Sequence, residues 1–395
     1  MFKVERTIIE KILKHSWLIA FAVITLLSAV IRYYGRTFVS GDMDYFFLPW
    51  YDQMKATGFK GLSEPLGDYN ILYQEIMLLL TLLPFKPLYL VKSVSILFDY
   101  LLALLAAMGV CSLKKEKYNS LDFLFAYFIV LFLPTVVLNS AFWGQCDGIY
   151  TFFILLVVFL SYGKRYRSAF LFLGIAFAFK VQTVFIVPFI LYLYILKKDF
   201  SLLNFLWSVL SFWACGIPAY IAGRGIFGTF EAYVSQVEAS GAMWFNFPSF
   251  WRMIGGDPAR LSTYAVALTI ALLGMGLLLL NKKKAVLSGK EEYFQCAVLT
   301  VWTCTLFLSN MRDRYNYPLD ILLIVLCFIN VKFTPFGIVS ILLSMKGYCI
   351  YLYTELGESL TYFDSAAMFV AWMVFTYGFF TKKKDFRVSR VQADE

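Results

Sequence analysis

Two carboxylates follow directly on the first apolar segment of the chain. Asp42 and Asp44 are flanked there by a glycine and a run of aromatic residues, at the point where a membrane helix would leave the bilayer. Side chains two residues apart point to opposite sides of an extended segment, and about 200° apart on a helix, so the two acids are not expected to share a role. One could act as a general base while the other orders the loop or holds a cation. The alternative is a solvated loop whose acids merely end a helix.

A second set of polar residues lies between two apolar segments further along the chain. Asn139, Gln145 and Asp147 are accompanied by Trp143, which could stack on a sugar ring. An ordinary solvated turn needs none of these groups. Lys180 also separates two apolar halves, where a lysine has little access to solvent unless a cavity or an anion is present. Phosphate is the obvious anion.

The third set of polar residues precedes an apolar segment near the end of the chain. Arg312 and Arg314 could clamp a phosphate through paired N–H donors, with Tyr315 beside them as a substrate contact. The alternative is an internal network of these arginines with Asp313.

Three further acids are candidates for binding or for structure. Asp68 lies in a Gly-Asp-Tyr-Asn stretch ahead of an apolar helix that carries Glu75, and the alternative to substrate binding is a helix-capping turn. Asp99 falls inside an apolar segment. A carboxylate there costs several kcal/mol unless it is paired, so it is expected to pair with another helix.

The composition indicates an integral membrane protein. Of the 395 residues 60% are hydrophobic and only 15% are charged, whereas a soluble domain has about 25% charged residues. The mean hydropathy is +0.70. The apolar runs are continuous, which favours helices over a β-barrel. The net charge of +9 lies in short loops between these runs and does not suggest nucleic-acid binding.

The cysteines and histidine give no sign of a metal site or a disulfide framework. The seven cysteines are scattered without a C-x-x-C pair, and the single histidine is His15. We therefore predict no cofactor and no metal.

Apolar runs predict an all-α, polytopic fold with about twelve transmembrane helices in a single integral membrane domain over 1–395. They lie at 16–34, 88–111, 121–138, 148–162, 202–222, 259–281, 292–309, 317–331, 334–354 and 365–380, with two shorter ones within 168–196. The run at 70–84 is assigned to an interfacial helix in the first external loop. If it crossed the membrane, the basic loop at 114–117 would lie outside.

The basic residues indicate the orientation in the cell membrane. Segments predicted to be cytoplasmic, including the N-terminus, contain 22 of the 35 Lys and Arg residues. They are 1–14, 112–120, 163–167, 197–201, 282–291, 332–333 and 381–395. The external side then receives the long loops and all three sets of polar residues, so function is expected outside.

Taken together, these motifs resemble those of the GT-C superfamily of membrane glycosyltransferases. They are most similar to bacterial proteins related to the GPI-anchor mannosyltransferases. The matching segments run in family order over most of 35–320: S-G-D-M-D-Y-F at 40–46, G-D-Y-N at 67–70, K-S-V-S-I-L-F-D at 92–99, N-S-A-F-W-G-Q-C-D at 139–147, F-K-V-Q-T-V-F-I-V-P at 179–188 and M-R-D-R-Y at 311–315. One departure is M-R-D-R-Y, where relatives usually carry M-H-E-R-Y, which indicates a sugar or an acceptor other than the usual one.

The resemblance implies an inverting, metal-independent transfer of a hexose, such as mannose, from a polyprenyl-phosphate donor to a glycan or glycolipid acceptor in cell-envelope biosynthesis. It implies a loop carboxylate as base, which matches Asp42 best and Asp44 next. The residues 1–320 would form the catalytic module, with additional helices in 321–395. The alternatives are a lipid-linked sugar flippase or transporter, an outer-face polysaccharide polymerase, and a structural membrane partner without chemistry.

Overall fold

The computed structural model describes residues 3–67, 69–230, 233–234, 241–284, 287–356 and 359–381. Nearly all regular structure in this part of the chain is helical, which confirms the predicted all-α class. The helices are α1 (Lys3–Lys14), α2 (Ser16–Gly35), α3 (Leu48–Thr57), α4 (Ile71–Thr81), α5 (Pro87–Lys114), α6 (Leu121–Phe132), α7 (Pro134–Val137), α8 (Asp147–Tyr162), α9 (Tyr166–Phe179), α10 (Val187–Lys197), α11 (Phe205–Ala214), α12 (Ile217–Ile221), α14 (Phe250–Ile254), α15 (Pro258–Lys282), α16 (Lys290–Phe307), α17 (Tyr317–Ile329), α18 (Thr334–Leu352) and α19 (Tyr362–Thr381). The strands β1 (Trp244–Phe245) and β2 (Met311–Arg312) form one short parallel pair.

Five helical segments are long and apolar enough to cross a bilayer. They are α2, α5, α15, the segment Val331–Leu352 that contains α18, and α19; α6 and the following segment Pro134–Trp143 make a sixth if this pair, bent by 51°, is one span. The predicted twelve crossings are not confirmed. Several predicted spans are shorter helices, such as the 16-residue α8 and the 13-residue α17. At 1.5 Å per residue these fall short of the roughly 30 Å of a hydrocarbon core.

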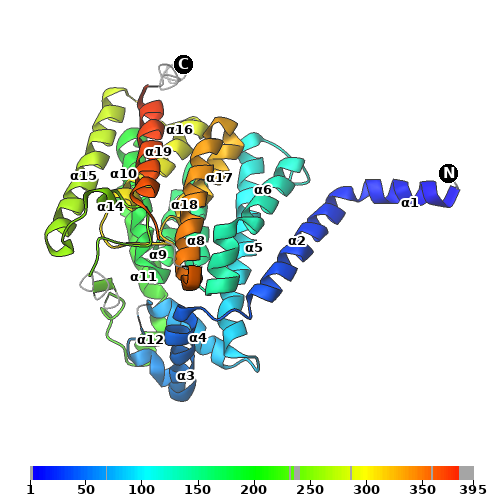
Figure 1. The fold of residues 1–395 in the computed structure, drawn as a ribbon, viewed down its shortest axis with the longest axis horizontal. Coiled ribbons are helices and arrows are strands. Elements are labelled where there is room, and N and C mark those ends of the chain that lie inside the picture. Colours follow the sequence, from blue (N-terminus) through cyan, green and yellow to red (C-terminus); the bar gives the residue numbers. More distant parts are fainter. Residues whose placement is uncertain are drawn as a thin grey trace.

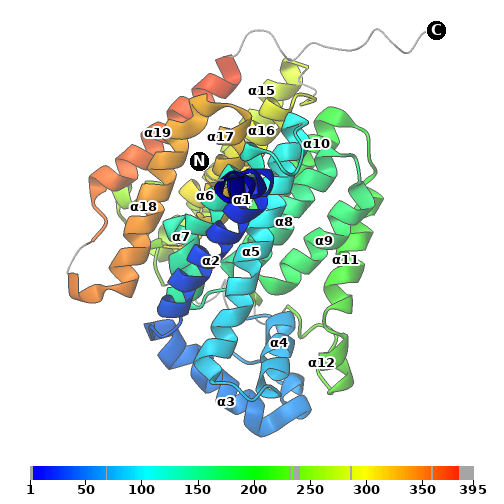
Figure 2. The same ribbon diagram turned by 90° about the vertical axis from the view of Figure 1, so that its right-hand side faces the viewer.

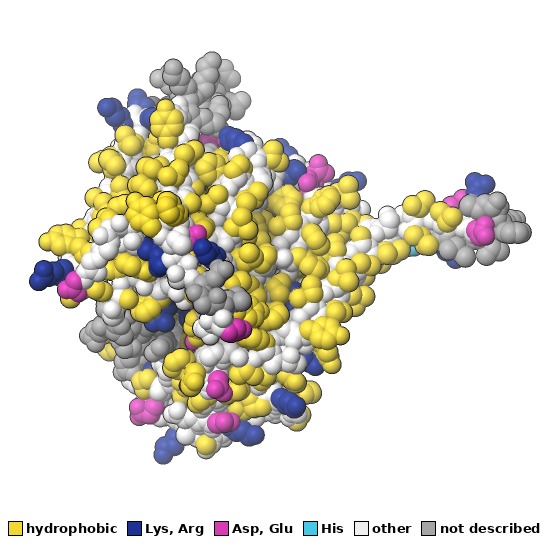
Figure 3. Space-filling view, viewed as in Figure 1, with side chains coloured by type: hydrophobic (Ala, Val, Ile, Leu, Met, Phe, Trp, Pro, Cys, Tyr) yellow, Lys and Arg dark blue, Asp and Glu magenta, His cyan; other side chains and the backbone are white. Residues whose placement is uncertain are grey.

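The surface of the bundle supports association with lipid. Large apolar side chains are exposed along the long helices, including Leu26 of α2, Leu278 of α15 and Tyr377 of α19. Figure 3 shows hydrophobic side chains covering the middle of one face, with charged side chains mostly toward its upper and lower edges. A surface of this kind is stable in a bilayer and costly in water.

The two ends of the bundle differ. The short helices α3, α4 and α12 gather at one end, while the last helix, α19, ends at the other (Figures 1 and 2). Basic loops predicted to be cytoplasmic lie together: Lys290 donates to the carbonyl of Leu113 over 3.1 Å, and Lys332 pairs with Glu291 at 2.5 Å. The 11-residue α4 is too short to span a bilayer, which agrees with its predicted place in a loop.

A buried ion pair joins the first two long helices. Arg32 of α2 lies 2.8 Å from a carboxylate oxygen of Asp99 in α5, and both side chains are almost completely buried. The same oxygen accepts a hydrogen bond from Ser140 over 2.5 Å. The prediction that Asp99 pairs with another helix is therefore confirmed.

Candidate active site

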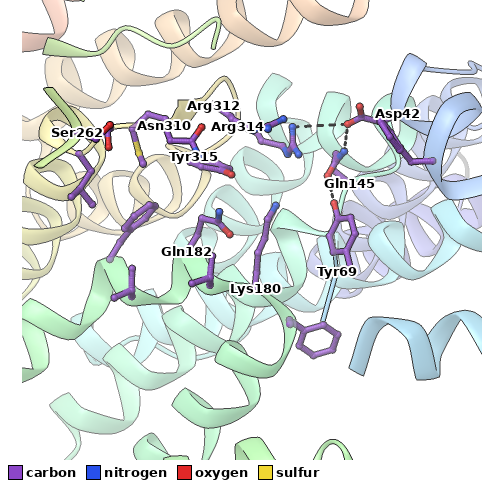
Figure 4. Close-up of a pocket in the computed structure, with 18 of the residues that line it drawn as sticks. Asp42, Tyr69, Gln145, Lys180, Gln182, Ser262, Asn310, Arg312, Arg314 and Tyr315 are labelled. Carbon is purple, nitrogen blue, oxygen red and sulfur yellow. Dashed lines mark hydrogen bonds and ion pairs between the residues drawn. The ribbon is translucent and has the colours of Figure 1, made fainter. Parts of the chain in front are cut away.

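A cavity of about 570 Å³ lies where the predicted polar residues meet. Its walls come from the start of the π-helix η1 (Met43–Phe47), the end of α9, the 3₁₀-helix η4 (Val181–Ile186), α15 and the segment between α16 and α17. The lining includes four charged side chains: Asp42, Lys180, Arg312 and Arg314. Figure 4 shows them pointing into one space from these separate elements.

The carboxylate of Asp42 is held by three donors. Trp143 Nε1 donates to Oδ2 over 2.8 Å and Gln145 Nε2 donates to the same oxygen over 2.5 Å. The hydroxyl of Tyr351 donates to Oδ1. A carboxylate offers about four lone-pair sites, so one remains for a group in the cavity. Asp42 is therefore fixed in orientation and able to accept one more hydrogen bond.

The loop that carries Asp42 is itself fixed to the turn that carries its donors. Ser40 Oγ donates to the carbonyl of Trp143 over 2.9 Å and accepts from the backbone N–H of Met43 over 3.2 Å. Gly144 follows with φ +82°, and a Cβ there would lie 2.3 Å from the Met43 side chain. Only glycine combines this backbone conformation with so close an approach.

Lys92 binds both the loop that carries Asp42 and the turn that carries its donors. Its ammonium group donates to the carbonyls of Phe38, Ala141 and Phe142 over 2.5, 2.8 and 2.8 Å, and to that of Gly35 over 3.3 Å. These carbonyls lie at or just after the C-terminal ends of α2 and of the π-helix η3 (Leu138–Trp143), where the helix dipole is negative. The lysine is completely buried. It therefore positions the Asp42 loop and the Trp143–Gln145 turn relative to each other.

Two of the predicted phosphate-binding cations are already paired with an acid. Asp147 is fully buried; its Oδ1 lies 2.5 Å from Lys180 Nζ and its Oδ2 lies 3.4 Å from Arg314 Nε. Asn139 donates to the same Oδ2 over 2.9 Å. The internal network considered as an alternative is therefore present for Arg314, which lies 3.5 Å from Asp313, but it does not include Arg312.

The charges within this network are close to balanced. Arg314 also lies 4.0 Å from Asp42, so one guanidinium links three carboxylates. Burial raises the pKa of Asp313 to about 7, although the neighbouring arginine lowers it. A buried cation between acids holds those acids in place, but it has less charge left over for a ligand.

Arg312 differs from the other two cations. It is exposed, it lines the cavity, and it has no ion pair within the described part of the chain. Its guanidinium lies 5.0 Å from the ring of Phe245, and the pairing of β1 with β2 sets Phe245 opposite it. Among the predicted cations it is therefore the one available to an anion.

Tyrosine side chains complete the polar wall of the cavity. Tyr69 donates to Gln145 Oε1 over 2.5 Å, so this glutamine links Tyr69 to Asp42 (Figure 4). Tyr315, a predicted substrate contact, also lines the cavity. Its ring lies 5.8 Å from the Lys180 ammonium group.

Several predicted site residues do not reach the cavity. Asp44 is exposed and does not line it, since the π-helix turns its side chain away from that of Asp42. Glu75 lies on α4 outside the lining, and burial raises its pKa to about 7. Asn139 is buried behind the cavity against Asp147. Asp68 lies outside the described residues.

The suggestion that Trp143 stacks on a sugar needs correction. Its side chain is completely buried, one ring face is covered by Tyr351 at 4.3 Å between centroids, and Arg314 lies 5.1 Å from the ring. No face is left for a ligand. The indole N–H instead orients Asp42.

The sequence reasoning missed two tyrosines of α18. Tyr351 donates to Asp42, and Tyr348 accepts from Asn139 over 3.2 Å. Both lie beyond residue 320, so the C-terminal helices contribute to the cluster as well. The only signal was a run of tyrosines at the end of an apolar segment, which is also typical of a membrane interface.

The fold and the cavity together define a helical, membrane-associated protein whose cavity contains an oriented carboxylate, two cations paired with acids, one arginine that has no ion pair among the described residues, and several aromatic side chains. No protein-family model matches the sequence, and a search of curated proteins finds no significant relative. Within the described ranges, no three His, Cys, Asp or Glu side chains come together as metal ligands.

Proposed function

We propose that this protein is a membrane glycosyltransferase that uses a polyprenyl-phosphate sugar as donor and a hydroxyl of a glycan or glycolipid as acceptor. The observation that carries the proposal is the Asp42 carboxylate, oriented by three donors, with one acceptor site left at the cavity. A fixed carboxylate of this kind is suited to take a proton from an attacking hydroxyl.

The apolar part of the cavity wall supports a lipid-linked donor. Val184 and Val266 line the cavity, and each is more than two-fifths exposed. Val266 belongs to α15, one of the five helices suited to crossing a bilayer. An isoprenoid chain can therefore remain in lipid while its phosphate and sugar enter the cavity.

In the proposed reaction the acceptor oxygen attacks the anomeric carbon as the bond from that carbon to the phosphate oxygen breaks. The bonding pair leaves with the polyprenyl phosphate, and the acceptor proton passes to Asp42. The anomeric configuration inverts because attack and departure occur on opposite faces. The leaving phosphate is already anionic and needs no acid, but its charge needs a fixed cation, and Arg312 is the free candidate.

The external location of the site remains part of the proposal. It is supported by the positive-inside pattern of the loops and by the contacts that join three of these basic segments. On this basis the N-terminus is cytoplasmic and the cavity opens toward the outer face.

Mass spectrometry of cell-envelope glycans tests the proposal. Cells without the protein should lack a sugar residue or a whole glycan, and wild-type protein should restore it while D42N should not. Envelope glycans that are unchanged by the loss of the protein, or that D42N restores fully, would contradict the proposal. An accumulated lipid diphosphate glycan would point to a polymerase, and a donor lipid trapped on the cytoplasmic side to a transporter.

A further inference from the structure

Two side-chain amides line the cavity without a partner. Gln182 lies in η4, two residues after Lys180, and only 6% of its surface is exposed. Asn310 lies in the segment between α16 and β2, on the opposite wall. Within the described residues neither amide makes a hydrogen bond, and an oxygen atom of each is buried and unsatisfied. Buried polar groups are normally satisfied, so these two indicate a missing partner.

The backbone holds Asn310 at the cavity. Asn310 has φ +58°, a left-handed conformation in which asparagine is enriched. The next residue, Met311, pairs with Trp244 across the two-stranded sheet, which fixes this segment. Figure 4 shows Asn310 on one wall and Gln182 rising from the other, both away from the Asp42 end of the cavity.

The chemistry of an amide selects its partner. A primary amide offers both donors and acceptors. A phosphate at neutral pH mostly accepts, so it would leave the amide oxygens unsatisfied. A sugar hydroxyl both donates and accepts, and it can satisfy an amide in either orientation. The ring of Tyr315, which also lines the cavity, offers an apolar surface beside them.

We propose that Gln182 and Asn310 form a subsite for the hydroxyl groups of a pyranose ring and determine which sugar the protein accepts. This inference rests on the proposed function, since it gives the sugar its place in the cavity. The ring belongs either to the donor or to the acceptor glycan, and the chemistry at the two amides is the same in both cases.

The first test measures binding of simple sugars to the protein in lipid nanodiscs by saturation-transfer NMR. The probes are the methyl glycosides of glucose, mannose and galactose, with their monodeoxy analogues. Q182M keeps the length of the side chain and removes the amide, and N310G keeps the left-handed backbone. The matched controls are Q53M, at an exposed position of α3, and N246G, which also has a positive φ but lies outside the cavity.

Wild-type protein and both controls should bind one methyl glycoside better than its deoxy analogues. Q182M and N310G should each weaken that binding by about 3- to 10-fold, the usual range for one lost hydrogen bond. Each should also lose the preference over one particular deoxy analogue, an effect that a general structural change would not produce. If wild-type protein binds no glycoside, or if both variants keep the full preference, the inference is overturned.

A second test assigns the ring and separates this inference from the proposed function. With a polyprenyl-phosphate sugar, Q182M should slow both sugar release to water and transfer if the ring is that of the donor. It should raise only the acceptor KM if the ring is that of the acceptor. Normal transfer by Q182M and N310G would refute the subsite without contradicting the proposed glycosyltransferase activity. Glycoside binding without transfer from any such donor would refute the glycosyltransferase instead.

Discussion

Replacing Lys92 with methionine should separate the two segments that build the site. Methionine keeps most of the aliphatic stem, which is completely buried in α5, and removes the ammonium group. Four backbone carbonyls then lose their donor at once. They belong to the chain just before Asp42 and to the π-helix just before Gly144.

The size of the effect follows from the contacts. An ammonium group has three protons, and three of the four contacts are 2.8 Å or shorter. At about 1.5 to 3 kcal/mol for each hydrogen bond to a charged group, they sum to about 4 to 9 kcal/mol. Methionine avoids the desolvation of the ammonium, which offsets several kcal/mol of this sum. We expect a net loss of about 3 kcal/mol in the free energy of unfolding.

Thermal unfolding in nanodiscs, followed by intrinsic fluorescence, measures this loss. K60M is the matched control, because Lys60 is an exposed lysine, in the 3₁₀-helix η2 (Gly58–Ser63). K92M should unfold several degrees below wild type, K60M should match wild type, and limited proteolysis should cut K92M faster just after α2. Equal unfolding temperatures and equal proteolysis of the two variants would show that Lys92 does not anchor these segments.

Three further predictions concern the site and its surroundings. R312A should raise the donor KM by about 10-fold with little change in unfolding temperature. R260A, at an exposed position of α15, should leave the donor KM unchanged. An unchanged donor KM in R312A would show that Arg312 does not bind the phosphate. Y351F removes one donor to Asp42 and should lower kcat by about 3- to 10-fold with an unchanged donor KM, so a normal kcat would mean that this contact does not orient the carboxylate. Burial raises the pKa of Glu75 to about 7, so the folded state favours the neutral acid. The contribution of Glu75 to the free energy of unfolding is therefore fully present below about pH 4.5 and is lost as the pH rises through 7. E75Q should therefore match wild type in unfolding temperature at about pH 4.5 and exceed it at about pH 8.5, and a constant difference between the two would contradict the raised pKa.

The sequence predicted the kind of fold better than its details. Long apolar runs identify helices that face lipid, such as α2 and α15, because those runs have the length of a bilayer. They do not separate a crossing helix from one buried among other helices. Residues 292–307 of α16 are all buried, and α16 is not among the segments suited to crossing.

For the site, residue types were predictable but their relations were not. Asp42, Gln145 and Lys180 stand out in the sequence because polar side chains beside apolar segments are costly to bury unless they have a binding partner or a function. That Trp143 donates to Asp42 across 101 positions, and Tyr351 across 309, depends on how distant helices pack. No local pattern records such packing. The choice between Asp42 and Asp44 likewise depends on the local backbone: Asp42 precedes the π-helix and lines the cavity, whereas Asp44 lies within that helix and does not line it.

Transfer by the D42N variant tests the central claim most directly. Asparagine can turn its oxygen toward the donors Trp143 and Gln145, and its N–H₂ toward the Tyr351 hydroxyl, which can also accept, so the site should keep its shape. The measurement is transfer of a labelled sugar from polyprenyl phosphate by purified protein in nanodiscs, with D44N as the matched control. D42N should transfer about 100- to 10,000-fold more slowly than wild type while binding the donor with unchanged affinity, and D44N should stay near wild type. Near-normal transfer by D42N would show that Asp42 is not the general base, and loss of transfer in D44N alone would assign that role to Asp44.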